Sequence, residues 1–218
     1  MTESGIKLDF FRTSQGRALS LCLAMMFVGS VGLDQVSKAQ AHKTLLVWED
    51  GQDPELYRGS RAPVFVVGKK YPDPGVVPFY FQLQMQYSRN RGAAFSMLSN
   101  LPDNVRVPFF YGVTVIAVVL IGVYLRSTPF QQHLTRCGLI LILSGAIGNF
   151  IDRVTRGYVV DFIDTEWNIL GWRHDFAIFN VADVAINVGV ICLVLEMITQ
   201  WLKDRRAAAH TANEVPSP

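Results

Sequence analysis

The chain has 218 residues, of which 50% are hydrophobic and only 17% are charged. Average soluble domains carry about 25% charged residues, so this composition argues against a soluble globular enzyme and against a disordered chain. The formal net charge of +2 is too small to favour nucleic acid as a partner. The three cysteines form no CxxC pair and the four histidines no HExxH motif, so neither a disulfide framework nor a zinc hydrolase is predicted.

Four apolar stretches approach the roughly 20 residues that a helix needs to cross a bilayer. The first covers about residues 18–38 and follows the basic residues Lys7, Arg12 and Arg17. A signal peptide begins in the same way, but no small-x-small cleavage site ends the stretch, so we predict an uncleaved membrane helix. Asp34 and Lys38 are four residues apart, a spacing that favours a salt bridge at the end of this helix.

The segment that follows, about residues 43–95, contains strand patterns. Residues 81–87 alternate apolar side chains with glutamines, as a half-buried strand does, and residues 64–67 form a second candidate strand. Glycines and prolines between residues 68 and 78 mark turns. We expect a small β-sheet on the outer face of the membrane, with its apolar side free to lie on the membrane or on partner strands. The sequence does not reveal the role of the long insert at about residues 43–80.

The rest of the chain holds three more spans and a tail. The spans cover about residues 107–125, 134–152 and 177–202. Residues 153–176 form a second outer loop, in which Trp167 and Trp172 suit the membrane interface. We predict one integral membrane domain over residues 1–206 and a disordered tail over residues 207–218.

Four spans place both chain termini on the same side of the membrane. Eight basic residues flank that side in short segments: Lys7, Arg12, Arg17, Arg126, Arg136, Lys203, Arg205 and Arg206. The positive-inside rule therefore predicts that both termini are cytoplasmic.

Polar residues inside membrane spans are costly, about 2.5–3.5 kcal/mol for an aspartate at a helix centre, so their positions are informative. In the fourth span, Asn180, Asp183 and Asn187 are spaced to lie on one helical face, which cannot face lipid. A second set shares a face at the end of the third span: Asn149, Asp152 and Arg153. Both sets are predicted to lie near the outer membrane surface.

Two carboxylates held close together in a low-dielectric site cannot both ionise, so they share a proton and can act as acid and base. Asp183 is the firmest member of such a pair, and its partner is Asp152, Asp161 or Asp164. Asp152 precedes Arg153, which is a candidate ion-pair mate. Asp161 lies between aliphatic residues after the turn at Gly157, so its pKa is the more readily raised.

Two other readings remain open from the residues alone. Buried Asn and Asp side chains also serve as hydrogen-bonding contacts between membrane helices, or as the polar path of a small transporter or channel subunit. A path needs polar groups through the whole membrane, and the second span has essentially none. A presenilin-type or prepilin-peptidase-type protease carries GxGD, whereas residues 157–161 read Gly-Tyr-Val-Val-Asp.

The ordered set of polar blocks resembles the lipoprotein signal peptidase (signal peptidase II) family of bacterial inner-membrane aspartyl proteases. The matching blocks are Asp34-Gln35-Val36-Ser37-Lys38, Asn90-Arg91-Gly92-Ala93-Ala94-Phe95, Gly148-Asn149-Phe150-Ile151-Asp152-Arg153, Val160-Asp161-Phe162 and Phe179-Asn180-Val181-Ala182-Asp183. The resemblance covers about residues 17–203. Relative to the family, the segment between Lys38 and Asn90 and the carboxyl-terminal tail are long.

The resemblance implies an α-helical membrane protein with four transmembrane helices and a small extracytoplasmic β-sheet, or cradle. It implies Asp161 and Asp183 as the catalytic pair, with no metal and no organic cofactor. The supporting or substrate-binding residues are Asp34, Lys38, Asn90, Gly92, Asn149, Asp152, Arg153 and Asn180. Gly92, with Ala93 and Ala94, offers a surface of small residues to the substrate backbone.

The implied substrate is a prolipoprotein whose lipobox cysteine already carries a diacylglyceryl group, and the signal peptide is cut off just before that cysteine. The enzyme is expected to work as a monomer among the lipids of the inner membrane, with its active site near the outer face. The sequence leaves open which lipoproteins it processes and which aspartate is protonated at rest.

Overall fold

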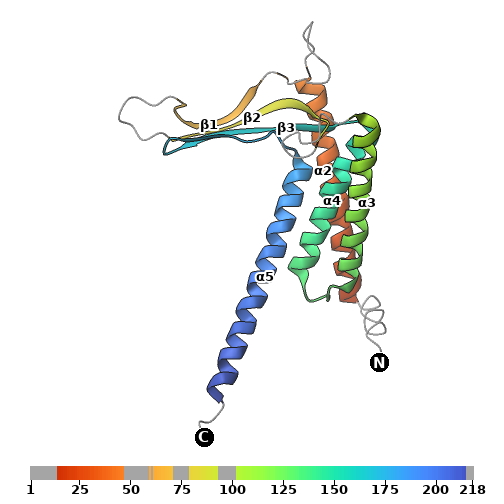
Figure 1. Ribbon diagram of the computed structural model, residues 1–218, viewed down its shortest axis with the longest axis vertical. Coiled ribbons are helices and arrows are strands. Elements are labelled where there is room, and N and C mark those ends of the chain that lie inside the picture. The colour runs from red at the N-terminus through yellow and green to blue at the C-terminus, as the bar shows by residue number, and fades with distance from the viewer. Residues whose placement is uncertain (1–13, 47–58, 60, 71–78, 93–101, 215–218) are drawn as a thin grey trace.

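A computed structural model describes residues 14–46, 59, 61–70, 79–92 and 102–214 of the chain (Figure 1). The long helices in these ranges are α2 (Ser14–Leu45), α3 (Asp103–Ser127), α4 (His133–Arg156) and α5 (Val181–Glu214). Each of the four is long and apolar enough to cross a membrane. The predicted class, a four-span helical membrane protein, is confirmed.

The ends of α5 differ from the prediction. The helix begins at Val181 rather than near residue 177, because residues 177–180 form the connection that enters it. It then continues to Glu214, so residues 207–214 are helical where a disordered tail was expected. Three successive alanines, residues 207–209, explain the extension, since alanine is the strongest helix former. The rest of the predicted tail, residues 215–218, lies outside the described residues, as do Lys7 and Arg12.

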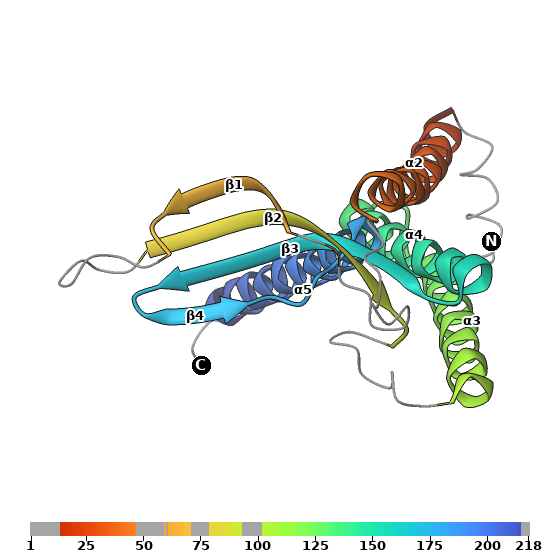
Figure 2. The same cartoon turned by 90° about the horizontal axis from the view of Figure 1, so that it is seen from above.

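Helix α4 is the centre of the bundle. It packs against α2, α3 and α5, and it is the most buried of the four helices, whereas α3 is the least buried. Figures 1 and 2 show that α5 leaves the other helices toward its carboxyl end. The four helices are thus held together mainly around α4, with α5 closest to it near the end where α5 begins.

A four-stranded antiparallel sheet lies across one end of the bundle, which we call the sheet end (Figure 1). Its order is β1 (Ala62–Gly68), β2 (Phe79–Asn90), β3 (Val159–Ile169) and β4 (Trp172–Asp175). The first described residue of α2 and the end of α5 lie at the opposite end. Both strands predicted within residues 43–95 are confirmed, although residues 43–45 belong to α2 and the turns at residues 71–78 lie outside the described residues.

The second half of the sheet, β3 and β4, was predicted as an outer loop, and that prediction is wrong. Buried positions alternate along β3, but they carry polar side chains, Asp164, Glu166 and Asn168. On β2 the same alternating positions include two buried glutamines, Gln84 and Gln86, besides Tyr80. The covered face of this part of the sheet is therefore polar, so a search for alternating hydrophobicity does not find β3.

Two local features attach β3 to the helices. Gly157 ends α4 with a φ of 79°, in the left-handed region that favours glycine, which confirms the predicted turn. Farther along the chain, the backbone of Phe179 exchanges hydrogen bonds with Ile163, at 2.8 and 3.0 Å. The start of α5 is thereby fixed beside β3, which brings Asp183 of α5 close to Asp161 of β3.

Candidate active site

Asp183 lies in the first turn of α5 and is held by a reciprocal cap. The backbone N–H of Asp183 donates to Asn180 Oδ1 at 3.0 Å, and the backbone N–H of Asn180 donates to Asp183 Oδ2 at 3.1 Å. This is the capping-box arrangement, with Asn180 as the residue before the helix. Asn180 therefore does not share a helical face with Asp183, as the i, i+3 spacing predicted. The spacing instead marks a helix start. Asn187 is exposed and donates to the Asp183 carbonyl.

Asp161 lies on β3, opposite Ser88 of β2, and only 4% of it is exposed. Asn90 Nδ2 donates to its Oδ2 at 2.9 Å, and Asn180 Nδ2 donates to its Oδ1 at 2.6 Å. Burial raises the pKa of Asp161 to about 7, and the nearby charge of Asp183 acts in the same direction, against the two amide hydrogen bonds. Asp161 is thus able to hold a proton near neutral pH.

Asparagine side chains connect the two aspartates. Asn180 bonds to both of them, as described above, and Asn149 Nδ2 donates to Asp183 Oδ1 at 2.9 Å. Neither aspartate forms an ion pair with any described residue. No ion pair with a described residue therefore lowers the affinity of these two carboxylates for a proton.

A second buried cluster lies directly behind this pair. Lys38 Nζ is 2.8 Å from Asp34 Oδ2 and 3.0 Å from Asp152 Oδ2, and all three side chains are almost fully buried. The predicted bond between Asp34 and Lys38 is confirmed, but it lies within α2, which continues to Leu45. The ammonium also donates to Asn149 Oδ1 at 2.9 Å, so Asn149 links the Lys38 cluster to Asp183.

The two carboxylates of this cluster each hold the backbone just before a residue of the Asp161–Asp183 pair. Asp34 Oδ1 accepts from the N–H of Ala182 at 2.9 Å, and Asp152 Oδ2 accepts from the N–H of Val160 at 3.1 Å. Lys38 binds both carboxylates, and so it fixes the start of α5 and the start of β3 relative to each other.

Close helix packing makes these contacts possible. A Cβ at Gly148 of α4 would lie 2.6 Å from Asp34 Oδ2, and a Cβ at Gly145 would lie 2.3 Å from the Ala182 carbonyl oxygen. Any side chain at these positions would push α4 away from α2 and α5, because interiors are packed to full density.

Arg153 occupies the other side of the pair. Its Nη2 donates to the Gly92 carbonyl at 3.0 Å, and its guanidinium lies over the ring of Phe110, 4.4 Å from the centroid. Both Asp161 and Asp183 are within electrostatic reach of this cation. Gly92 is buried and its N–H donates to Asn90 Oδ1 at 3.0 Å. Ala93 and Ala94 of the predicted small-residue surface lie outside the described residues.

All ten predicted site residues thus come together at the sheet end. Two of the alternatives that the residues left open differ from the contacts in the structure. Asp152 pairs with Lys38 and Arg156 rather than with Arg153, because Arg156 is one helical turn away while Arg153 is adjacent and points elsewhere. Asp164, one of the three candidate partners for Asp183, is bound to Gln84 at 2.6 Å and to Arg61 at 3.4 Å.

The sequence analysis did not single out two residues of the buried cluster. Gln35 Nε2 donates to Asp34 Oδ2 and to the Gly148 carbonyl, each at 3.0 Å. Arg156 bonds to Asp152 Oδ1. The i, i+4 spacing of Asp152 and Arg156 on α4 is the sequence signal that identifies the second of these contacts.

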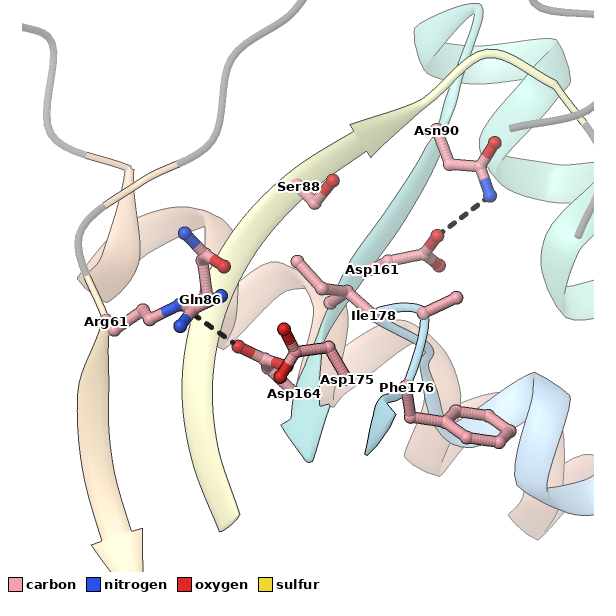
Figure 3. A pocket seen from close by; sticks show the side chains of 10 residues that line it. Arg61, Gln86, Ser88, Asn90, Asp161, Asp164, Asp175, Phe176 and Ile178 are labelled. Carbon is pink, nitrogen blue, oxygen red and sulfur yellow. Dashed lines mark hydrogen bonds and ion pairs between the residues drawn. The ribbon is translucent and has the colours of Figure 1, made fainter. Parts of the chain in front are cut away.

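A cavity of about 310 Å³ opens beside Asp161, between the strands and the segment that leads into α5 (Figure 3). Asn90 and Asp161 line the end nearest the helices. Within the described ranges, no group of three or more His, Cys, Asp or Glu side chains is arranged to hold a metal ion. Asp161, which lines this cavity, belongs to a pair of carboxylates oriented by amides, an arrangement that suits proton transfer to and from a substrate.

Known proteins resemble the chain over most of its length. The lipoprotein signal peptidase of Geobacter metallireducens is 48% identical over 123 residues, 56% of this chain and 71% of that protein. The lipoprotein signal peptidase of an Anaeromyxobacter species is 35% identical over 179 residues, 79% of this chain and 82% of that protein.

The structural comparison agrees with these relatives. A bacterial membrane enzyme solved by the in meso method at 2.3 Å resolution superposes with a TM-score of 0.57 at 28% identity, covering 90% of this chain and 93% of that one. The family profile described as signal peptidase (SPase) II matches residues 26–199. None of these findings supports a transporter or channel. The chain therefore belongs to the signal peptidase II family.

Proposed function

We propose that this protein removes the signal peptide from prolipoproteins, by hydrolysing the peptide bond just before a cysteine that carries a diacylglyceryl group. The observation that carries the proposal is the Asp161–Asp183 pair, which is bridged by Asn180 and has no ion-pair partner among the described residues. The names of the relatives support the substrate class, since each is a lipoprotein signal peptidase.

In this proposal the two carboxylates have different tasks. Asp183 lies at the amino-terminal end of α5, and it is assigned as the base that takes a proton from the attacking water. Asp161 holds the shared proton and donates it to the carbonyl oxygen of the scissile bond. Collapse of the hydrated intermediate then needs a proton on the leaving amine, which the protonated member of the pair supplies.

The remaining predicted residues support this pair. Asn90, Asn149 and Asn180 orient the carboxylates through the amide hydrogen bonds described above. Asp34, Lys38 and Asp152 hold the backbones of β3 and α5. Arg153 fixes the Gly92 carbonyl and limits the negative charge around the pair.

The charge distribution supports an orientation in the membrane. The basic residues at the end of the bundle opposite the sheet are Arg17, Arg126, Arg136, Lys203, Arg205 and Arg206. By the positive-inside rule that end faces the cytoplasm, which places the catalytic pair and the sheet near the outer face of a bacterial inner membrane. The apolar signal peptide would then stay among the spans and the lipid in the bilayer. We propose that the enzyme acts as a monomer.

The experiment is a cleavage assay with purified full-length protein in detergent and a diacylglyceryl-modified prolipoprotein. Asp161→Asn and Asp183→Asn should each lower kcat by about a hundredfold or more, since a proton-transfer group contributes roughly 10²- to 10⁴-fold. Thermal unfolding of both variants is measured alongside cleavage. Each carboxylate accepts two hydrogen bonds, one on each oxygen, and an asparagine can accept on one side only, so a modest loss of stability is expected in a protein that still folds.

The matched control is Asp204→Asn, an exposed acid elsewhere on α5, which should retain wild-type turnover. Full turnover by either Asp161→Asn or Asp183→Asn would overturn the assignment of the pair.

A further inference from the structure

The cavity beside Asp161 extends beyond the catalytic pair and along the sheet. At the far end from Asp161 it is lined by Arg61 at the start of β1, Gln86 of β2, and Asp164 and Asp175 of β3 and β4 (Figure 3). Side chains from β2, β3 and β4 thus meet around this end, together with Arg61 just before β1. Most of the side chains that line the cavity are polar, and Phe176, Ala177 and Ile178 supply its apolar part. The surfaces of the helices below the sheet are mainly apolar.

Gln86 lines this end of the cavity and carries a hydrogen-bond acceptor without a partner. The residue is only 8% exposed, and its Nε2 donates to the Gly59 carbonyl at 2.7 Å. Because a carbonyl only accepts, this bond fixes the amide nitrogen on that side and leaves Oε1 on the other. That oxygen is buried and has no hydrogen-bond partner among the described residues.

The backbone explains why Gln86 is placed there. Strand β2 pairs Met85 with Ile163 and Ser88 with Asp161, so two residues of β2 stand opposite one residue of β3. Such a bulge redirects side chains next to active sites. A buried acceptor without a partner costs about 1–3 kcal/mol, and a ligand that donates a hydrogen bond would remove this cost.

The charges at this end favour the same kind of ligand. Arg61 forms an ion pair with Asp164 at 3.4 Å, and the two charges offset each other. Asp175 is exposed on β4 and has no ion-pair partner among the described residues. The far end of the cavity therefore carries one surplus negative charge besides the catalytic pair, which favours a cation or an N–H or O–H donor.

We propose that this part of the cavity is a subsite for the first residues of the mature lipoprotein, those just after the lipid-carrying cysteine. This inference rests on the proposed function. The signal peptide is apolar and belongs among the helices, whereas a polar cavity on the sheet side of Asp161 suits the segment that leaves the membrane. Gln86 and Asp175 then make the subsite prefer hydrogen-bond donors and basic side chains over acidic ones.

The test uses two diacylglyceryl-modified prolipoprotein peptides that differ only at the second and third positions after the cysteine, both lysine in one and both glutamate in the other. With the full-length enzyme, kcat/KM should be about fivefold higher for the lysine peptide, the upper end of what a partly exposed ion pair contributes. Asp175→Asn should reduce this ratio to about twofold or less.

A second variant probes the acceptor. Gln86→Met keeps the size of the side chain but removes the acceptor, and it should raise KM for a peptide with serine at both positions while kcat changes little. The matched control is Asp103→Asn, an exposed acid at the same end of the molecule but outside the cavity, which should leave the lysine-to-glutamate ratio unchanged.

Equal kcat/KM for the two peptides with the wild-type enzyme would overturn the subsite alone. The same conclusion follows if Asp175→Asn keeps the full ratio, as Asp103→Asn is expected to do. If the wild type cleaves neither peptide, the proposed function fails, and the subsite fails with it.

Discussion

At the sheet end of the bundle, Asp34 and Asp152 share the Lys38 ammonium, whereas Asp161 and Asp183 are held by asparagine side chains. The two pairs lie side by side, since Asn149 bonds to both Lys38 and Asp183. Lys38 thus neutralises one pair, and amide dipoles alone orient the other.

In the proposed mechanism, this difference separates structural acids from reactive ones. Asp34 and Asp152 are bound to a buried cation, and each also accepts a backbone N–H group. A carboxylate held only by amides next to another carboxylate keeps a high affinity for a proton, as Asp161 does. Burial alone does not distinguish the two carboxylate pairs, since Asp161 is buried like Asp34 and Asp152. The difference lies in their bonding partners, a lysine for one pair and amides for the other.

The largest expected effect comes from removing the shared cation. Lys38→Met leaves Asp34 and Asp152 buried without Lys38, and loss of one partner from a buried ion pair costs about 3–5 kcal/mol. Thermal unfolding in detergent micelles should show this loss, together with loss of cleavage activity. Lys203→Met, on the exposed part of α5, is the control and should unfold like the wild type. A wild-type unfolding temperature for Lys38→Met would mean that the cluster does not hold the fold.

The next effect is a pH dependence that belongs to Asp161. An unfolded aspartate titrates near 3.8 and Asp161 in the folded protein at about 7. The folded state therefore holds an extra proton between these values, so the stability contributed by Asp161 is present below about pH 4 and is lost as the pH rises toward 7. Asp161→Asn removes this dependence.

The measurement compares the unfolding free energies of the wild type and Asp161→Asn. Between about pH 4 and pH 8 the difference should move against the wild type by on the order of 1–4 kcal/mol. Parallel curves across this range would show that Asp161 does not titrate there.

The sequence predicted the residues of both carboxylate pairs, but it did not predict that Lys38 binds one pair and asparagine side chains bind the other. Five ordered blocks located Asp34, Asn149, Asp161 and Asp183, because motif residues keep their order along the chain. The pairing of Asp152 with Lys38 joins α4 to α2, and no local spacing specifies a contact between residues 114 positions apart.

The fold shows the same limit. Apolar spans of about 20 residues can be predicted directly from the sequence. The i, i+3 spacing of Asn180 and Asp183 was interpreted as one helical face, whereas in the structure it forms the cap at which α5 begins. Strand β3 was not predicted because its covered face carries the acidic residues Asp164 and Glu166. Contacts from neighbouring elements, such as the bond from Gln84 of β2 to Asp164, account for these buried acids, and they cannot be predicted from the sequence of β3 alone.

A smaller effect should follow from crowding the cation-paired set. Gly148→Ala places a Cβ 2.6 Å from Asp34 Oδ2 and 3.3 Å from Ala182 Cβ, and overpacking of this kind typically costs about 1–3 kcal/mol. Cleavage activity should fall as well, since Asp34 holds the N–H of Ala182. In the control, Gly122→Ala on α3, nothing lies within 4 Å of the added Cβ, so stability should be equal or up to about 1 kcal/mol higher. Equal behaviour of the two variants would contradict the close contact at Gly148.

The smallest effect is expected at Glu196, the other acid in the apolar part of α5. It lies 13 residues beyond Asp183, roughly 20 Å along the helix, and its carboxylate accepts from Gln200 Nε2 at 2.9 Å. Glu196→Gln should therefore keep kcat within about twofold of the wild type and leave the pH profile in place. A large loss would mean that the reaction depends on a polar group roughly 20 Å away along α5, as a proton path through the helices requires. The division between the two carboxylate pairs at the sheet end would then no longer account for the chemistry.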